Sequence, residues 1–314
     1  MPHRTQSDRI REARTGFTLV ELLLVISIIA LLIGLILPAL ASARKSAQGA
    51  ACLSQMAQTS VGWGLYANEN RGQLVPGQPG RYADESKNRY WVGNGYQYRP
   101  RWYAMMGAAA GFYAFAEPSD QIEDEHSTQI TNEVFICPST PKWTSTRNSS
   151  YGYNYQFLGN ARFRGDDETQ GFINYPVRLS RIEAVSTTVM AADSLGTAAG
   201  KPDAERTPNQ SDGSRHPEGL ARGGHGYALD PPRLTGTSDF ADTRLSAPEH
   251  RSGPDERHNG VANVVFCDGS ARSMTATELG YLKNADGSIA FNGATTTNKL
   301  FSGTNRDEDP PPVN

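Results

Sequence analysis

Hydrophobic residues are concentrated in one stretch near the N-terminus. Residues 17–37 read FTLVELLLVISIIALLIGLIL, which is 21 residues with one charged side chain, Glu21. A helix of this length is roughly 30 Å long at about 1.5 Å per residue, which matches the hydrocarbon core of a bilayer. The pattern therefore predicts a transmembrane helix over residues 17–38.

A second periodic pattern follows Pro38. Apolar and small residues recur about every 3.6 positions, which is typical of an amphipathic helix. They are Leu40, Ala43, Ala47, Ala50, Leu53, Ala57, Val61 and Leu65. We expect one helix over residues 17–68, with an outer half over 39–68 that packs its small-residue stripe against a sheet or another helix. Pro38 lacks a backbone N–H, so it is expected to kink or locally melt this helix.

The rest of the chain, residues 69–314, predicts a loop-rich α+β head with an antiparallel sheet packed on the long helix. Expected elements are a short buried helix within 102–115, strands within 133–140, 149–159 and 187–192, and a hairpin over 264–275 that turns at Asp268-Gly269. A polar segment at about 200–254, rich in Gly, Pro, Asp and Arg, is expected to be a surface insertion. The acidic and proline-rich tail at about 305–314 is expected to be disordered.

Charge sets the orientation and excludes one class of partner. The net charge is −3 over 314 residues, which gives no reason to expect a nucleic-acid partner. Basic residues precede the apolar stretch at Arg4, Arg9, Arg11 and Arg14, and the next ones follow only at Arg44 and Lys45. This asymmetry predicts a cytoplasmic N-terminus and an exported head.

Glu21 is the residue that a simple membrane segment does not explain. A carboxylate within lipid costs on the order of 3 kcal/mol unless it finds a partner. A plain membrane anchor provides no partner that would offset this cost. A secretory signal peptide cut after Ala41, where Ala39 to Ala41 fit the small-x-small rule, gains nothing from an acid. A membrane protein that packs against copies of itself can supply a positive charge at the same depth.

The residues around Glu21 favour that third possibility. The run GFTLVE, from Gly16 to Glu21, resembles the processing signal of type IV prepilins and of type II secretion pseudopilins. The resemblance implies that a prepilin peptidase cuts between Gly16 and Phe17, which removes a leader of residues 1–16, and that the Phe17 nitrogen is then methylated. Glu21 becomes the fifth residue of the mature chain and faces the N-terminal amine of a neighbouring subunit during assembly.

The head carries a second, more distributed resemblance. The blocks CLSQMAQ, YANENRGQL, FICPS, SYGYN, MAADS and RHNGVANVVFCDGS are similar, in this order, to bacterial pseudopilin-like proteins with a His-x9-Asp-Gly signature. Here that signature runs from His258 to Asp268-Gly269. The group is similar to the major pseudopilin of type II secretion. Cys267 and the polar insertion at about 200–254 depart from the pattern.

Two candidate sites in the head can be named from the sequence. The first is a metal site with Asp193, His258 and Asp268 as ligands and Asp255 as a further carboxylate; the resemblance implies calcium, which prefers oxygen ligands. A second functional possibility is that His258 and Asp268 act as an acid–base pair. The structural alternative is that Asp268 sets a turn and His258 is bound to a backbone carbonyl.

The second is a disulfide between Cys52 and Cys137, with Cys267 left over. It would close a loop of about 85 residues and contribute about 4–5 kcal/mol in the chain-entropy model. The alternative is buried free thiols.

The expected function is structural. The resemblance implies a single-pass protein of the bacterial inner membrane that assembles with its own copies and other pseudopilins, on a secretion-system platform, without a cofactor or a reaction. Its partners would include prepilin peptidase, membrane lipid and a cytoplasmic motor ATPase. The rival is an exported enzyme or binding protein that uses a prepilin-type anchor and carries its site on the insertion.

Overall fold

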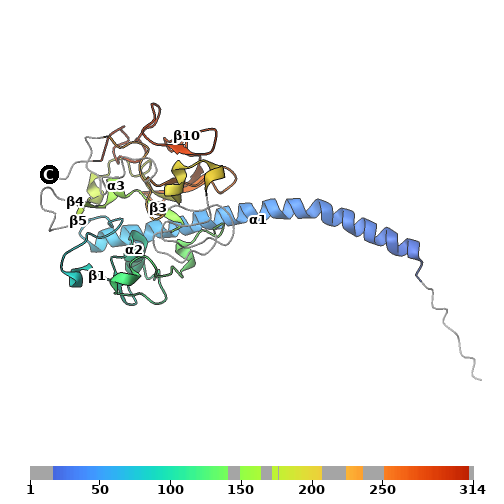
Figure 1. Cartoon of the computed structure of the whole chain (residues 1–314), viewed down its shortest axis with the longest axis horizontal. Helices are drawn as coiled ribbons and strands as arrows, with labels where there is room; N and C mark the ends of the chain where they lie inside the picture. Colours follow the sequence, from blue (N-terminus) through green and yellow to red (C-terminus); the bar gives the residue numbers. More distant parts are fainter. Residues whose placement is uncertain are drawn as a thin grey trace, which may run out of the picture. The chain divides into compact units, whose positions relative to one another are not determined.

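The computed structural model describes residues 17–140, 149–163, 172–175, 177–206, 224–235 and 251–310. The expected leader, including Gly16, lies outside the described residues. The chain divides into two units, Met1–Arg44 and Lys45–Asn314. Helix α1, Leu19–Glu69, begins in the first unit and ends in the second (Figure 1).

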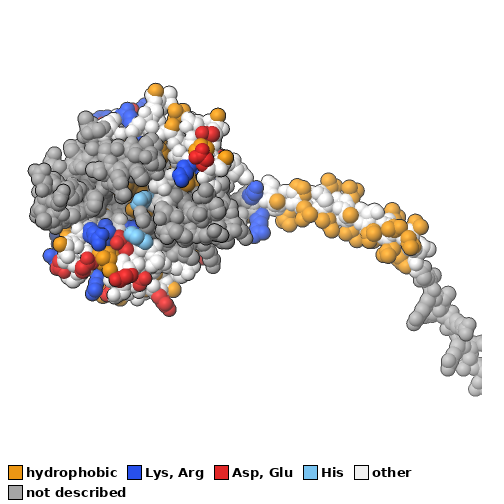
Figure 2. Space-filling model, in the orientation of Figure 1, with side chains coloured by type: hydrophobic (Ala, Val, Ile, Leu, Met, Phe, Trp, Pro, Cys, Tyr) orange, Lys and Arg blue, Asp and Glu red, His pale blue; other side chains and the backbone are white. Residues whose placement is uncertain are grey.

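Helix α1 confirms the expectation of one long helix, with bounds close to the predicted 17–68. It continues through Pro38, so local melting at that residue is wrong. By length and composition α1 could cross a membrane, and none of its most apolar window is buried among the described residues. Figure 2 shows hydrophobic side chains along this segment. The hydroxyl of Ser27 donates to the carbonyl of Leu23 at 2.7 Å. This bond gives the hydroxyl a partner that lipid could not provide.

The second half of α1 is buried on a different face from the predicted one. The buried side chains include Cys52, Met56, Trp63 and Ala67, which recur at helical spacing. In the predicted stripe, Val61 is 59% exposed and Leu65 is 42% exposed. The buried face is the one that carries Met56 and Trp63, and these two long side chains remove more apolar area from water than alanine does. In the second unit, Ala47, Ala50, Val61 and Leu65 of the predicted stripe are exposed, whereas Leu53 and Ala57 are half-buried.

The central sheet of the second unit is antiparallel. Its strands lie in the order β3 (Tyr151–Tyr153), β6 (Val189–Gly196), β8 (Ala262–Phe266) and β9 (Ala271–Met274), and β7 (Gly253–Pro254) also pairs with β6. Every residue of β6 is buried. The sheet and the long helix give the α+β class that the sequence predicts.

Two hydrophobic clusters cover the two faces of this sheet. Ala191 of β6 and Val265 of β8 belong to the cluster that contains Cys52, Met56 and Trp63 of α1. The neighbouring residues of the same strands belong to a second cluster with the C-terminal part of the chain: Val189, Ala192, Val264, Phe266, Tyr281, Phe291 and Phe301. Strand β6 thus lies between α1 on one face and C-terminal residues on the other, because successive side chains point to opposite faces.

Helix α2 (Trp102–Ala110) confirms the expected short buried helix. A methyl group at Gly62 of α1 would lie 3.2 Å from the carbonyl oxygen of Met106, so glycine allows α1 and α2 to approach closely. Trp63 donates to the Tyr153 hydroxyl at 3.0 Å, and Trp102 stacks on the Tyr153 ring. These rings connect α1, α2 and β3.

The remaining elements are short. One short helix and three strand pairs lie outside the central sheet. The helix is α3 (Tyr155–Leu158), and the pairs are β1 (Arg89–Trp91) with β2 (Tyr96–Tyr98), β4 (Asn160–Phe163) with β5 (Phe172–Tyr175), and β10 (Leu282–Lys283) with β11 (Ile289–Ala290). Short 3-10 helices occur at Glu85–Asn88, Ile122–Asp124, Glu133–Phe135, Leu179–Arg181, Thr197–Gly200 and Asp203–Glu205.

The strand predictions have mixed outcomes. The 264–275 hairpin is confirmed by β8 and β9, and the 187–192 strand corresponds to β6. The 149–159 segment forms β3 and then α3. The strand expected within 133–140 is wrong: a 3-10 helix forms there because the Asn132 side chain accepts the backbone N–H of Val134 and caps it.

The expected insertion and tail also differ from the structure where it describes them. Residues 224–235 are not a surface loop: Tyr227, Leu229 and Asp230 are buried, and Trp102 donates to the Tyr227 carbonyl at 2.8 Å. Residues 207–223 and 236–250 lie outside the described residues. In the tail, the Asp307 carboxylate accepts the backbone N–H of Asn298, so this part is ordered, whereas 311–314 is not described.

Candidate functional site

The N-terminal end of α1 holds the first candidate site. Thr18 precedes the helix and Glu21 lies three residues later, and the two form a capping box. The Glu21 Oε2 atom accepts the Thr18 backbone N–H at 2.9 Å and the Thr18 hydroxyl at 2.8 Å, while the Glu21 N–H donates to the Thr18 hydroxyl at 3.2 Å. Phe17 is 73% exposed beside them. Within the single chain, Glu21 thus caps its own helix.

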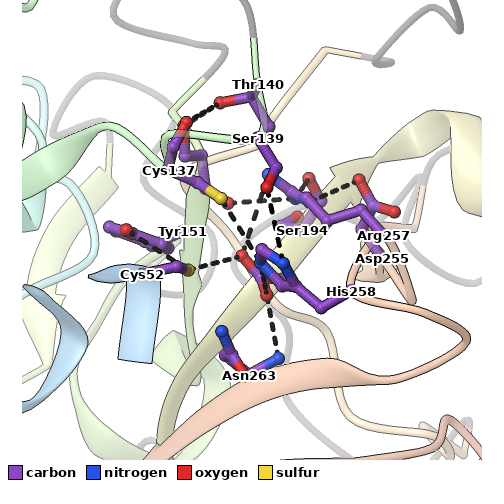
Figure 3. A network of polar contacts seen from close by, with 12 residues as sticks. Cys52, Cys137, Ser139, Thr140, Tyr151, Ser194, Asp255, Arg257, His258 and Asn263 are labelled. Atoms are coloured by element: carbon purple, nitrogen blue, oxygen red, sulfur yellow. Dashed lines mark hydrogen bonds and ion pairs between the residues drawn. The ribbon is translucent and has the colours of Figure 1, made fainter. Parts of the chain in front are cut away.

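The second candidate site is a buried cluster in the second unit. Cys52 of α1, Cys137 after the 3-10 helix, Asp193 of β6 and His258 before β8 each offer one ligand atom, and these atoms all lie within 4.8 Å of one another. Figure 3 shows Cys52, Cys137 and His258 converging from three separate parts of the chain. All four residues are buried.

Three contacts within this cluster join a sulfur or an imidazole nitrogen to another kind of atom. The Cys137 sulfur lies 3.4 Å from His258 Nε2. The same nitrogen lies 3.3 Å from Asp193 Oδ2, and the Cys52 sulfur lies 3.5 Å from Asp193 Oδ1. His258 therefore directs one nitrogen at both a sulfur and a carboxylate.

A tight turn places His258. Asn259 and Gly260 both have positive φ, and the backbone groups of His258 and Val261 bond to each other at 3.1 and 3.3 Å. Asn-Gly is the favoured pair for a turn that needs two such residues. A methyl group at Gly49 would lie 3.4 Å from His258 Nδ1, so a glycine on α1 leaves room for the imidazole ring.

Neighbouring groups hold the other side chains of the cluster. Asp193 Oδ2 accepts the backbone N–H of Asn263 at 2.8 Å, and an Arg257 nitrogen lies 3.7 Å from Asp193 Oδ1. The Tyr151 hydroxyl donates to the Cys52 sulfur at 3.5 Å. His258 Nδ1 lies 3.5 Å from the Ser139 hydroxyl. The cluster is thus surrounded by polar groups that orient it.

These contacts shift the acid–base behaviour of the cluster. A hydrogen bond from Cys52, assisted by His258 and opposed by burial, lowers the pKa of Cys137 to about 5. Hydrogen bonding to Cys137 and burial raise the pKa of Cys52. Burial lowers the pKa of His258, but hydrogen bonds to Asp193 and Cys137 outweigh it and raise the pKa to about 9. Burial opposes ionisation of Asp193, yet Arg257 and His258 keep its pKa below the ordinary value.

The cluster does not have the geometry of a Cys-His-Asp catalytic triad. In a triad the nucleophile and the acid contact opposite nitrogens of the histidine, so that a proton can pass across the ring. Here Cys137 and Asp193 both face Nε2. Four convergent donor atoms around a common point are instead the arrangement that binds a metal ion.

The structure brings together some of the predicted residues. Asp193 and His258 are neighbours, as the metal prediction requires. Asp268 is exposed, accepts the backbone N–H of Ser270 and does not belong to the cluster. Asp255 pairs with Arg257 at 2.8 Å. Cys52 and Cys137 lie together as the disulfide prediction requires, although both are free thiols; the bond itself stays a prediction.

The two cysteines and the Asp–His pair form one site, which was not predicted from the sequence. All four residues were singled out from the sequence, but in two separate sets. The pairing of α1 with β6 unites them, and no local pattern specifies which helix residue faces which strand residue.

Comparisons with models of protein families, with curated proteins and with solved structures found no match to this chain.

Proposed function

We propose that this chain is a structural, pseudopilin-like subunit of a type II secretion or type IV pilus-like apparatus. In this proposal prepilin peptidase cuts between Gly16 and Phe17, α1 anchors the mature subunit in the bacterial inner membrane, and copies assemble through α1. The observation that carries the proposal is an acidic residue in the first turn of a helix that is otherwise long and apolar enough to span a bilayer.

The contacts of Glu21 are compatible with a partner from another copy. Among the described residues, both hydrogen bonds that its carboxylate accepts from Thr18 end on Oε2, which leaves Oε1 for a further donor. The N-terminal amine that cleavage would create at Phe17 of a neighbouring copy is a donor of the right charge. Pairing two opposite charges in lipid removes most of the cost that a lone carboxylate incurs.

The free face of α1 supports the same assembly. Val61 and Leu65 lie on the helix face opposite the buried one and remain exposed in the single chain. Packing this face against α1 of another copy would remove apolar area from water. The rival, an exported enzyme with its site on the insertion, would need that site outside residues 224–235, which are mostly buried.

The test separates the charge of Glu21 from its capping role. Gln can also accept the Thr18 N–H in a capping box, so Glu21→Gln keeps the cap and removes the charge. Thr18→Ala removes the cap and keeps the charge. Both variants are expressed beside a prepilin peptidase and an assembly apparatus, and membrane insertion and incorporation into sheared filaments are measured by immunoblot.

We expect Glu21→Gln to insert normally but to lose at least tenfold in incorporation, while Thr18→Ala is incorporated at nearly the normal level. Equal losses in the two variants would mean that Glu21 only caps its helix. Normal incorporation of Glu21→Gln would contradict the proposal.

A further inference from the structure

We propose that Cys52, Cys137, Asp193 and His258 form a tetrahedral zinc site that fastens α1 to the sheet of the second unit. The proposal does not depend on filament assembly. It rests on the positions of the four donor atoms, on the chemistry of the set and on the groups around it.

Three of the six distances between donors fit a tetrahedron around zinc. Zinc binds sulfur at about 2.3 Å, imidazole nitrogen at about 2.0–2.1 Å and carboxylate oxygen at about 2.0–2.2 Å, so tetrahedral sulfur–nitrogen, sulfur–oxygen and nitrogen–oxygen edges are roughly 3.4–3.6 Å. The measured edges are 3.4 Å for Cys137–His258, 3.5 Å for Cys52–Asp193 and 3.3 Å for His258–Asp193. The other three edges are no longer than 4.8 Å, so an ion at the centre would draw the remaining donors inward.

The donor set selects the metal. Two sulfurs, one imidazole and one carboxylate favour zinc, whereas calcium takes six to eight oxygen ligands. With the two cysteines ionised, a divalent ion and its ligands carry one net negative charge. Arg257, whose side chain is 8% exposed, lies 3.7 Å from Asp193 and 2.8 Å from Asp255, so the site shares its positive charge with Asp255. The structure thus favours zinc over the calcium that the resemblance implies.

The surrounding contacts are those of a metal site with oriented ligands. A histidine that binds metal through one nitrogen usually bonds through the other, and Nδ1 of His258 faces the Ser139 hydroxyl. Asp193 is held by the backbone N–H of Asn263, and the Tyr151 hydroxyl donates to Cys52. Each of the three ligands therefore keeps its direction without the ion.

The role that follows is structural rather than catalytic. Four protein ligands complete a tetrahedron and leave no position for substrate, and all four residues are buried. The ligands come from α1, from the loop after Phe135, from β6 and from the turn before β8. One ion would thus tie together four segments that are distant in sequence.

The experiment uses the full-length chain in detergent, reduced and then supplied with cobalt(II) or zinc(II). We expect one equivalent of metal per chain, by elemental mass spectrometry. With cobalt we expect a thiolate charge-transfer band in the near ultraviolet and the visible bands of a tetrahedral ion. These signatures come from the wild-type protein, so they do not depend on whether a variant folds.

Variants identify the ligands. Cys52→Ser and His258→Asn should each lower the affinity for zinc at least tenfold and alter the cobalt spectrum, with circular dichroism as the check on folding. Cys267→Ser is the matched control, because Cys267 is also a head thiol but lies outside the cluster, and it should bind one equivalent with the wild-type spectrum.

Two results would overturn the proposal. One is the absence of metal uptake by the reduced, folded wild-type chain. The other is a Cys52–Cys137 disulfide in protein isolated without reductant from the membrane, since sulfurs bonded to each other cannot serve as thiolate ligands. Peptide mapping after alkylation detects that bond.

Discussion

Asp193 shows how a single residue acquires a role from its neighbours. In the sequence it is an acid at the end of an apolar strand, MAAD, next to Ser194. In the structure it is fully buried between a thiol, an imidazole and a guanidinium. Its residue type allowed it to be named as a ligand. Its contact with Cys52 could not be predicted from the sequence, because that contact depends on tertiary packing.

The burial of Asp193 leads to a prediction about stability. Removing one partner of a buried charged network leaves the others uncompensated, which typically costs about 3–5 kcal/mol. Asp193→Asn should therefore lower the free energy of unfolding by about 3 kcal/mol. Asp268→Asn, at an exposed turn, should change it by less than about 0.5 kcal/mol. Denaturant unfolding of both variants measures the difference, and equal losses would contradict the role given to Asp193.

A second buried ion pair predicts pH dependence. Arg99 and Glu125 lie 2.6 Å apart with side chains about one-tenth exposed. Burial opposes ionisation of Glu125, but Arg99 and Arg101 outweigh it and lower its pKa below the ordinary 4.5. Because the folded pKa is the lower one, the ionised carboxylate stabilises the fold above pH 4.5, and this contribution is lost as the pH falls through the folded pKa.

Glu125→Gln should accordingly destabilise the protein by about 3 kcal/mol at neutral pH and flatten the dependence of stability on pH in the acid range. Glu123→Gln is the control, since Glu123 is exposed two residues away. Thermal unfolding from pH 3 to pH 7 measures both. An unchanged acid slope in Glu125→Gln would show that other carboxylates set it.

At the scale of elements, the sequence predicted α1 well and its buried face poorly. The length of the apolar run and the later periodicity fixed the helix to within two residues at either end. Two stripes compete on the outer half, one of small residues and one with Cys52, Met56 and Trp63, and periodicity alone does not rank them. The β8–β9 hairpin was predictable because Asp-Gly defines its turn. The segment at 133–140 was wrongly predicted as a strand because a side-chain cap favours a 3-10 helix over its strand-like residues.

The correction of the helix face can be tested with two neighbouring residues. Trp63 is 2% exposed and Leu65 is 42% exposed on the same helix. Trp63→Ala should cost about 3–5 kcal/mol of stability because it leaves a cavity beside Tyr153. Leu65→Ala should cost less than about 1 kcal/mol in the single chain. If Leu65→Ala proved the more destabilising, the predicted stripe would be the packed one after all.

At the scale of the whole molecule, the fold class could be predicted from the sequence, whereas the four-residue cluster could not. The antiparallel head on a long helix was predictable as a class, because local patterns specify helix, strands and turns. The four-residue cluster was not predictable as a site, because its ligands lie on segments up to about 200 residues apart and meet only through the sheet register. The proposed assembly goes beyond the single chain, and it is there that the function would be exerted.

The most direct test of the proposed function is the intact mass of the protein purified from the membranes of a host with prepilin peptidase. The account predicts a mature chain that begins at Phe17 and carries one additional methyl group on its N-terminal nitrogen. A chain that begins just after Ala41, with Glu21 removed, would contradict it.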